Sequence, residues 1–154
     1  MKKILLALFL TLGAVTVQAQ EIKWMTMDEA LVAQKKKAKP IFMDVYTDWC
    51  GPCKILDKVT FHDAEVVKYI SDNYYAVKFN AEGNSEVNYL GKKYANPQYD
   101  ASRKGRNAMH QFAASLNLEG YPSMVIFDAK TSKVKGTIVG NHTPPQLLEA
   151  LKTK

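Results

Sequence analysis

The most constraining feature of this 154-residue chain is an apolar run followed, within three residues, by a motif with two cysteines. The run Ile41–Tyr46 carries one charged residue, Asp44. A short segment without alternation is typical of a strand buried on both faces of a sheet. The motif at residues 49–54, Trp-Cys-Gly-Pro-Cys-Lys, contains a proline, Pro52, that the first turn of a helix tolerates. The sequence therefore predicts a buried strand that leads directly to a helix with both cysteines at its N-terminus.

The first 19 residues have the composition of a secretory signal peptide. Lys2 and Lys3 form a basic start, and residues 4–17 are nearly all apolar or small. Small residues before the expected cleavage point suit a signal peptidase, so we predict cleavage after Ala19. The apolar run is shorter than the roughly 20 residues that a bilayer span needs, which disfavours a membrane anchor. We therefore expect an exported protein with one domain over residues 20–154.

The charge is moderately basic and is not concentrated in a stripe. The net charge is +6, of which Lys2 and Lys3 supply two charges. Proteins that bind nucleic acid usually gather their basic residues on one face or along one helix. Nucleic acid is therefore not an expected partner.

The chain contains two cysteines, Cys50 and Cys53. Disulfides persist outside the cytoplasm, but a disulfide-stapled scaffold has several cysteines spread along the chain. A zinc site needs four ligands, and the three histidines are not at ligand spacing. A static disulfide and a metal half-site remain alternatives, yet the pair favours redox chemistry. We expect no metal and no other cofactor.

Local patterns predict the remaining elements. Thr26 and Glu29 form a capping box for a helix that ends near Lys36. The other expected elements are helices over 51–59 and 64–72, strands over 74–80, 123–128 and 134–139, and a last helix from Pro144 or Pro145. Residues 81–118 are the least regular part, with a short helix expected over 86–93 and a better one over 107–116. On the latter we expect His110 to lie on the polar side.

This order of elements resembles the thioredoxin family over about residues 41–151. Asp44 and Lys78 fall where the family has a buried aspartate and a lysine beside it. Tyr121 and Pro122 resemble its cis-proline loop, and Gly140 resembles its glycine turn near the active site. The resemblance implies an α/β thioredoxin fold. It consists of a central mixed β-sheet flanked by helices, with an inserted helical or loop segment (about 81–118) before the cis-Pro loop.

Residues 60–66 resemble exported members, among them the C-terminal domain of the thiol reductant transporter DsbD. Two features depart from a plain thioredoxin. The 81–118 segment is longer, and Tyr121 stands where a smaller aliphatic residue is usual. Both should lie on the face that meets a partner, so the identity of the substrate does not carry over.

The two cysteines suit thiol–disulfide exchange because a thiolate is the attacking species. Cys50, at the helix N-terminus and expected to be exposed, is the predicted nucleophile, since the helix dipole stabilises an anion there by roughly 0.3–2 kcal/mol. Cys53, one turn into the helix and covered, is expected to resolve the mixed disulfide. Gly51 and Pro52 hold the pair close and set its redox poise, which the resemblance implies to be reducing.

Asp44 is the candidate base that takes the proton of Cys53, because burial raises the pKa of a carboxyl group. The alternative is an acid satisfied by Lys78 with no chemical role; in the first interpretation Lys78 tunes Asp44. The resemblance implies a cis peptide bond at Pro122, which with Gly140 shapes the loop opposite Cys50. Trp49 and Tyr121 are expected to form an apolar docking rim, or else to be ordinary packing residues.

These observations predict a periplasmic thiol–disulfide oxidoreductase that takes part in cell redox homeostasis. Its expected partners are protein substrates with disulfides and an upstream thiol reductant in the membrane, and the protein itself is expected to be a monomer. The alternative is a thioredoxin-fold chaperone or assembly adaptor that binds clients without redox turnover. A metal carrier ranks last.

Overall fold

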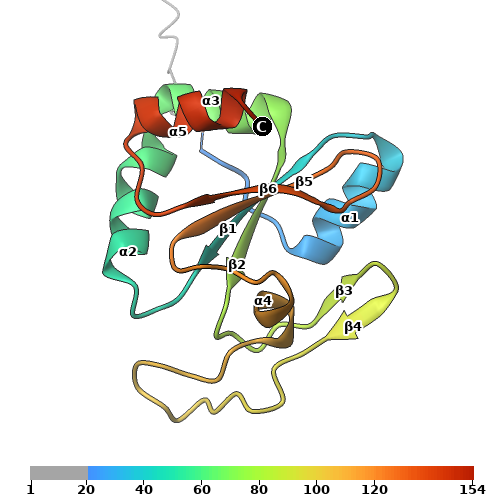
Figure 1. Cartoon of the computed structure of the whole chain (residues 1–154), viewed down its shortest axis with the longest axis vertical. Helices are drawn as coiled ribbons and strands as arrows, with labels where there is room; N and C mark the ends of the chain where they lie inside the picture. Colours follow the sequence, from blue (N-terminus) through green and yellow to red (C-terminus); the bar gives the residue numbers. More distant parts are fainter. Residues whose placement is uncertain (1–20) are drawn as a thin grey trace, which may run out of the picture.

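Strand β1 (Ile41–Tyr46) lies inside a four-stranded sheet whose order is β2-β1-β5-β6 (Figure 1). It pairs in parallel with β2 (Tyr75–Asn80) and antiparallel with β5 (Ser123–Phe127), which pairs antiparallel with β6 (Val134–Val139). The computed structural model describes residues 21–154, so the predicted signal peptide lies outside the described residues. The expected mixed sheet is confirmed, and its central strand is the one that the apolar run predicts.

Helices cover both faces of this sheet. The side chains of Phe42 and Met124 point to a cluster with Leu56 from α2 (Gly51–Lys58). The same cluster takes residues from the 3₁₀ turn η1 (Thr60–His62), α3 (Ala64–Asn73) and α5 (Pro144–Lys152). Alternate positions of β1 point to the opposite face, where α1 (Met27–Lys36) and the 81–118 segment cover them. The fold is therefore the predicted helix–sheet–helix arrangement of thioredoxins.

The predicted capping box at Thr26 and Glu29 is present, and the structure shows a second N-cap at Asp63. The Glu29 N–H donates to Thr26 Oγ1 at 3.2 Å, and the Thr26 N–H donates to Glu29 Oε2 at 2.8 Å. Asp63 Oδ1 accepts from the N–H groups of Glu65 and Val66 at the start of α3. These bonds satisfy donors that a helix N-terminus otherwise leaves free, so local sequence places both helix starts.

The predicted helix over 86–93 is wrong. The segment forms a hairpin of β3 (Val87–Tyr89) and β4 (Lys92–Tyr94). Its two-residue turn places Leu90 and Gly91 at φ +49° and +78°. A hairpin turn of this kind requires positive φ at both residues, and glycine adopts that conformation without strain. The hairpin packs through Val87 and Tyr89 on the α1 face of the sheet.

The predicted helix over 107–116 is wrong at its start. Helix α4 spans only Gln111–Ser115, Met109 is 57% exposed, and Phe112 packs against Phe79, Tyr89 and Tyr94. His110 is the N-cap, with extended backbone. In Figure 1 this insertion (yellow to brown) lies below the sheet, on the side away from α3 and α5.

His110 was expected on a polar helix side but is fully buried. Its Nδ1 accepts from the Phe112 N–H at 3.0 Å, and its Nε2 lies 2.6 Å from the Ser85 carbonyl oxygen. These partners select the neutral ring with its proton on Nε2. A second proton on Nδ1 would face the Phe112 N–H. Burial accordingly lowers the pKa of His110.

Protonation of His110 should loosen the insertion in acid. Because its pKa is lower in the folded state, the unfolded chain binds the proton first, so stability falls as the pH drops below about 6.5. The slope from one proton is at most about 1.4 kcal/mol per pH unit. The measurement is urea unfolding of wild type and His110→Asn, since asparagine can still cap α4. The wild type should lose stability relative to the variant on acidification; parallel curves would contradict this role.

Candidate active site

The two cysteines lie at the N-terminus of α2 and form a disulfide. Cys50 is the N-cap, and the Cys53 N–H donates to Cys50 Sγ at 3.2 Å. The two sulfur atoms are 2.03 Å apart, and the Cα atoms are 5.3 Å apart. Between them Gly51 and Pro52 are exposed, and Pro52 lies in the first turn, where helices accept proline. The N–H that approaches Cys50 Sγ would stabilise a thiolate at that atom in the reduced protein.

Cys50 is less accessible than the sequence suggested. The residue is only 3% exposed and Cys53 is 5% exposed, so the expected contrast between an open and a covered cysteine is wrong in this state. The physical reason is that the bond to Cys53 Sγ and the Cys53 N–H occupy two sides of the Cys50 sulfur.

Trp49 and Tyr121, the residues predicted to form a docking rim, lie together beside the motif. The rings of Trp49 and Tyr121 meet edge to face with centroids 6.3 Å apart, and Trp49 is 37% exposed. The Tyr121–Pro122 peptide bond is cis, as predicted. The Gly140 N–H donates to the Pro122 carbonyl oxygen at 2.9 Å, and Gly140 has φ +93°, which suits glycine. The structure thus brings the loop before β5, which contains Pro122, next to the turn after β6, which contains Gly140.

Asp44 is buried in the middle of β1. It is 2% exposed, and among residues 21–154 its Oδ1 has no hydrogen-bond partner. Burial raises the pKa of Asp44 to about 7, and the charge of Asp57 also raises it, while the charge of Lys78 opposes the shift. A carboxyl group with that pKa can accept and return a proton near neutral pH.

The partner of Lys78 differs from the simplest expectation. Lys78 is opposite Asp44 in the β1–β2 register, but its ammonium group pairs with Asp57 on α2. Asp57 was not predicted, although it follows Cys53 by four residues and therefore lies on the same side of the helix. Lys78 also lies 5.1 Å from the centre of the Trp24 ring and 5.5 Å from that of Tyr46. The Lys78 ammonium group thus also interacts with Asp57 and two aromatic rings, so its charge does not act on Asp44 only.

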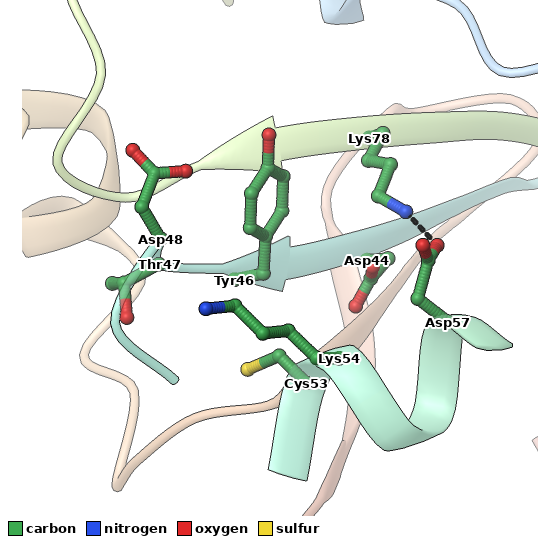
Figure 2. Close-up of a pocket in the computed structure, with 8 residues that line it drawn as sticks. All are labelled: Asp44, Tyr46, Thr47, Asp48, Cys53, Lys54, Asp57 and Lys78. Carbon is green, nitrogen blue, oxygen red and sulfur yellow. Dashed lines mark hydrogen bonds and ion pairs between the residues drawn. The ribbon is translucent and has the colours of Figure 1, made fainter. Parts of the chain in front are cut away.

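A pocket of about 240 Å³ joins these groups to Cys53 (Figure 2). In this view Asp44 lies between Cys53 and the Asp57–Lys78 pair. Its lining comes from β1, the following turn, α2 and β2, and consists of Asp44, Tyr46, Thr47, Asp48, Cys53, Lys54, Asp57 and Lys78. A pocket of this size, with charged side chains in its lining, has room for water, which can carry a proton between Cys53 and Asp44.

The histidines serve local structure. His62 Nδ1 lies 2.7 Å from the Asp57 carbonyl oxygen, and His142 Nδ1 lies 3.0 Å from that of Gly140. Within residues 21–154, no group of three or more histidine, cysteine, aspartate or glutamate side chains is arranged to hold a metal ion. The same part of the chain contains no helix long and apolar enough to cross a membrane.

Sequence comparison relates this chain to a thioredoxin-like domain and to thiol:disulfide interchange proteins. Residues 27–154 match the model of the thioredoxin-like domain. The thiol:disulfide interchange protein DsbD of Citrobacter koseri is 40% identical over 123 residues, which are 77% of this chain but 18% of that protein. DsbD of Escherichia coli K12 is 44% identical over 46 residues, 30% of this chain and 8% of its own. The chain thus spans less than a fifth of these relatives.

Solved structures agree with the fold. A proposed disulphide-isomerase of Bacteroides thetaiotaomicron superposes with a TM-score of 0.61 at 26% identity, covering 88% of this chain and 93% of that one. A thioredoxin of Thermus thermophilus gives a TM-score of 0.63 at 13% identity, with 86% of each chain covered.

Replacement of Asp44 by asparagine should stabilise the protein at alkaline pH. The folded pKa of about 7 exceeds the unfolded value near 3.9, so the acid form favours folding. That contribution is complete below pH 4, declines as the pH rises and is lost above about 7. Asp44→Asn should therefore gain roughly 4 kcal/mol at most at pH 8 and little at pH 4. Denaturant unfolding of the oxidised proteins measures this, and an equal difference at both pH values would refute it.

The Asp57–Lys78 pair should set the pKa of Asp44 in opposite directions. Asp57→Asn removes a negative charge and frees the ammonium group, so the pKa of Asp44 should fall below about 7. Lys78→Met removes the opposing cation, so the pKa should rise. Carboxyl ¹³C NMR titration reports both shifts, and Asp44→Asn identifies the signal. Shifts of the same sign in both variants would contradict the arrangement.

Proposed function

Since the chain belongs to the thioredoxin-like family, we propose that it is an exported, periplasmic thiol–disulfide oxidoreductase that reduces protein disulfides through Cys50 and Cys53. One observation carries the proposal: the two sulfur atoms are joined at a helix N-terminus, and Cys53 lines a pocket that also contains a buried carboxyl group, that of Asp44. A static structural disulfide would need neither that carboxyl group nor the pocket. The similarity to thiol:disulfide interchange proteins supports the same reaction class.

The reaction begins from the reduced pair. The Cys50 thiolate, stabilised by the Cys53 N–H, attacks one sulfur of the client disulfide. The S–S bond of the client breaks, a mixed disulfide with Cys50 forms, and one client thiolate leaves and takes up a proton.

The second step closes the internal disulfide. Asp44 accepts the proton of the Cys53 thiol through water in the shared pocket. The Cys53 thiolate attacks Cys50 Sγ, forms the observed S–S bond and expels the second client thiolate, which is then protonated. Two electrons have passed from the protein dithiol to the client, and a thiol reductant must return them.

The charges in the pocket favour the reducing direction. The Asp44 and Asp57 carboxyl groups lie with Cys53 around one cavity. Lys78 pairs with Asp57, so the negative charge left beside Cys53 is that of Asp44 when it is ionised. That charge opposes a thiolate on Cys53, which disfavours the reduced pair relative to the disulfide. A dithiol in that environment gives up its electrons readily. An upstream thiol donor, in our proposal a membrane protein, would regenerate it.

Export rests on the predicted signal peptide over residues 1–19. The relatives named as interchange proteins support a periplasmic location. Cleavage after Ala19 would release the domain that the family model matches.

Cysteine variants test the function directly. The reduced wild type should reduce insulin, with dithiothreitol as the source of electrons. Cys50→Ser should abolish the reaction because the attacking sulfur is lost. Cys53→Ser should instead accumulate a mixed disulfide, visible on non-reducing gels and by mass spectrometry, because the resolving thiol is lost.

Two outcomes would overturn the proposal. One is a folded wild type whose reduced thiols leave insulin intact. The other is binding of unfolded clients that is unchanged in the double serine variant, without turnover in the wild type; that result would favour the chaperone or adaptor.

A further inference from the structure

The inserted segment (residues 81–118) contacts the cysteine motif through Glu82. Glu82 Oε2 accepts a hydrogen bond from the Trp49 indole N–H at 3.0 Å and another from the backbone N–H of Asn107 at 2.7 Å. Trp49 immediately precedes Cys50. One carboxylate therefore fastens residues far apart in the sequence at the edge of the active site.

Arg106, the residue before Asn107, lies against the Trp49 ring at the same edge of the site. The Arg106 guanidinium carbon lies 4.2 Å from the centre of the Trp49 ring, a cation–π contact. Arg106 itself is exposed. No carboxylate within residues 21–154 lies within ion-pair distance of it, whereas Arg103 has Asp100 at 3.7 Å.

A stacked guanidinium has specific binding properties. Its face rests on the indole, and the N–H groups at its edge remain available for an acceptor. Arginine presents a planar fork of donors that matches a carboxylate, and stacking orders the side chain before a ligand arrives. The nearby Glu82 carboxylate already accepts two N–H donors and forms no ion pair with Arg106.

We propose that Arg106 is a specificity-determining residue that binds a carboxylate of the client beside the disulfide to be reduced. The inference rests on the proposed function, because the client is defined by its disulfide. The position of Arg106 determines which client carboxylates can reach it. Arg106 stacks on Trp49, which precedes the attacking Cys50, so the acidic side chain of the client must lie within a few residues of the attacked sulfur. Preferred clients are therefore peptides with Asp or Glu close to their cystine.

The test uses disulfide peptides that differ at one residue beside the cystine, which is Glu, Gln or Lys. The protein is first reduced with dithiothreitol, which is then removed, and single-turnover oxidation is followed. The wild type should prefer Glu over Gln by about threefold to fivefold at low salt, as for an exposed ion pair. The preference should appear as tighter binding at an unchanged maximal rate, and salt should weaken it.

Matched variants separate a local contact from net charge. Arg106→Gln should react with the Glu and Gln peptides equally. Lys104→Gln removes the same charge two residues away and should keep the wild-type preference. Arg106→Lys keeps the charge without the planar fork and should keep only part of it. Equal loss in Lys104→Gln and Arg106→Gln would overturn the inference in favour of general electrostatics.

An uncharged small disulfide, bis(2-hydroxyethyl) disulfide, distinguishes failure of the inference from failure of the proposed function. Two electrons pass from the dithiol to this disulfide, giving two mercaptoethanol molecules and the Cys50–Cys53 disulfide. A wild type that reduces it but does not discriminate Glu from Gln would overturn the role of Arg106 and leave the function standing. A wild type that reduces neither it nor any peptide would overturn the function, and the inference with it.

Discussion

Burial of the Asp44 carboxyl group in a strand covered on both faces is the constraint on which the site depends. An ionised carboxylate in that position is costly, and a partner that fully neutralised it would remove its ability to take up a proton. In this fold a cation is near Asp44 but does not fully neutralise it. Lys78 lies opposite Asp44 in the strand register, while its ammonium group pairs with Asp57. Asp44 therefore keeps a pKa of about 7, where a small change in its surroundings decides whether it holds its proton. This is a poor arrangement for stability and a useful one for proton transfer.

The same strand delivers the sulfur chemistry. Because β1 ends four residues before Cys50, the rigid sheet fixes the start of α2, and the α2 backbone fixes both sulfur atoms. Cys53 and Asp57 then lie one turn apart on the helix, so the proposed resolving cysteine and the residue whose charge raises the pKa of Asp44 are held by the same element. The two sulfurs have different surroundings as a result: Cys50 accepts a backbone N–H, while Cys53 borders the pocket that contains Asp44. This difference supports the proposal that attack and resolution fall to different residues.

The sequence was sufficient where local patterns decide the structure. The apolar run, the proline within the helix start and the capping box each specify an element through nearest neighbours, and the family resemblance supplied the cis bond at Pro122. The failures lie where distant contacts decide. Histidine is an uncommon N-cap, so the sequence does not indicate that α4 begins after His110. The hairpin turn is only weakly indicated, because of its two residues Gly91 favours positive φ and Leu90 does not. The contact between Arg106 and Trp49 depends on how an irregular segment returns to the site, which no local pattern encodes. Asp57 could have been found from its four-residue spacing to Cys53.

The insertion divides structural and functional demands between its two parts. Val87, His110 and Phe112 bury one part against the α1 face of the sheet, where replacement would disturb the core. The part around Arg106 is exposed and touches the active site mainly through one hydrogen-bonded carboxylate and one stacked cation. Substitutions there would change the surface that we propose to meet the client, but not the thiols, Asp44 or the sheet. Loops held by a rigid scaffold are a common place for such variation. The proposed reaction thus depends on β1, α2 and the loop that contains Pro122, whereas the proposed choice of client depends on the inserted segment.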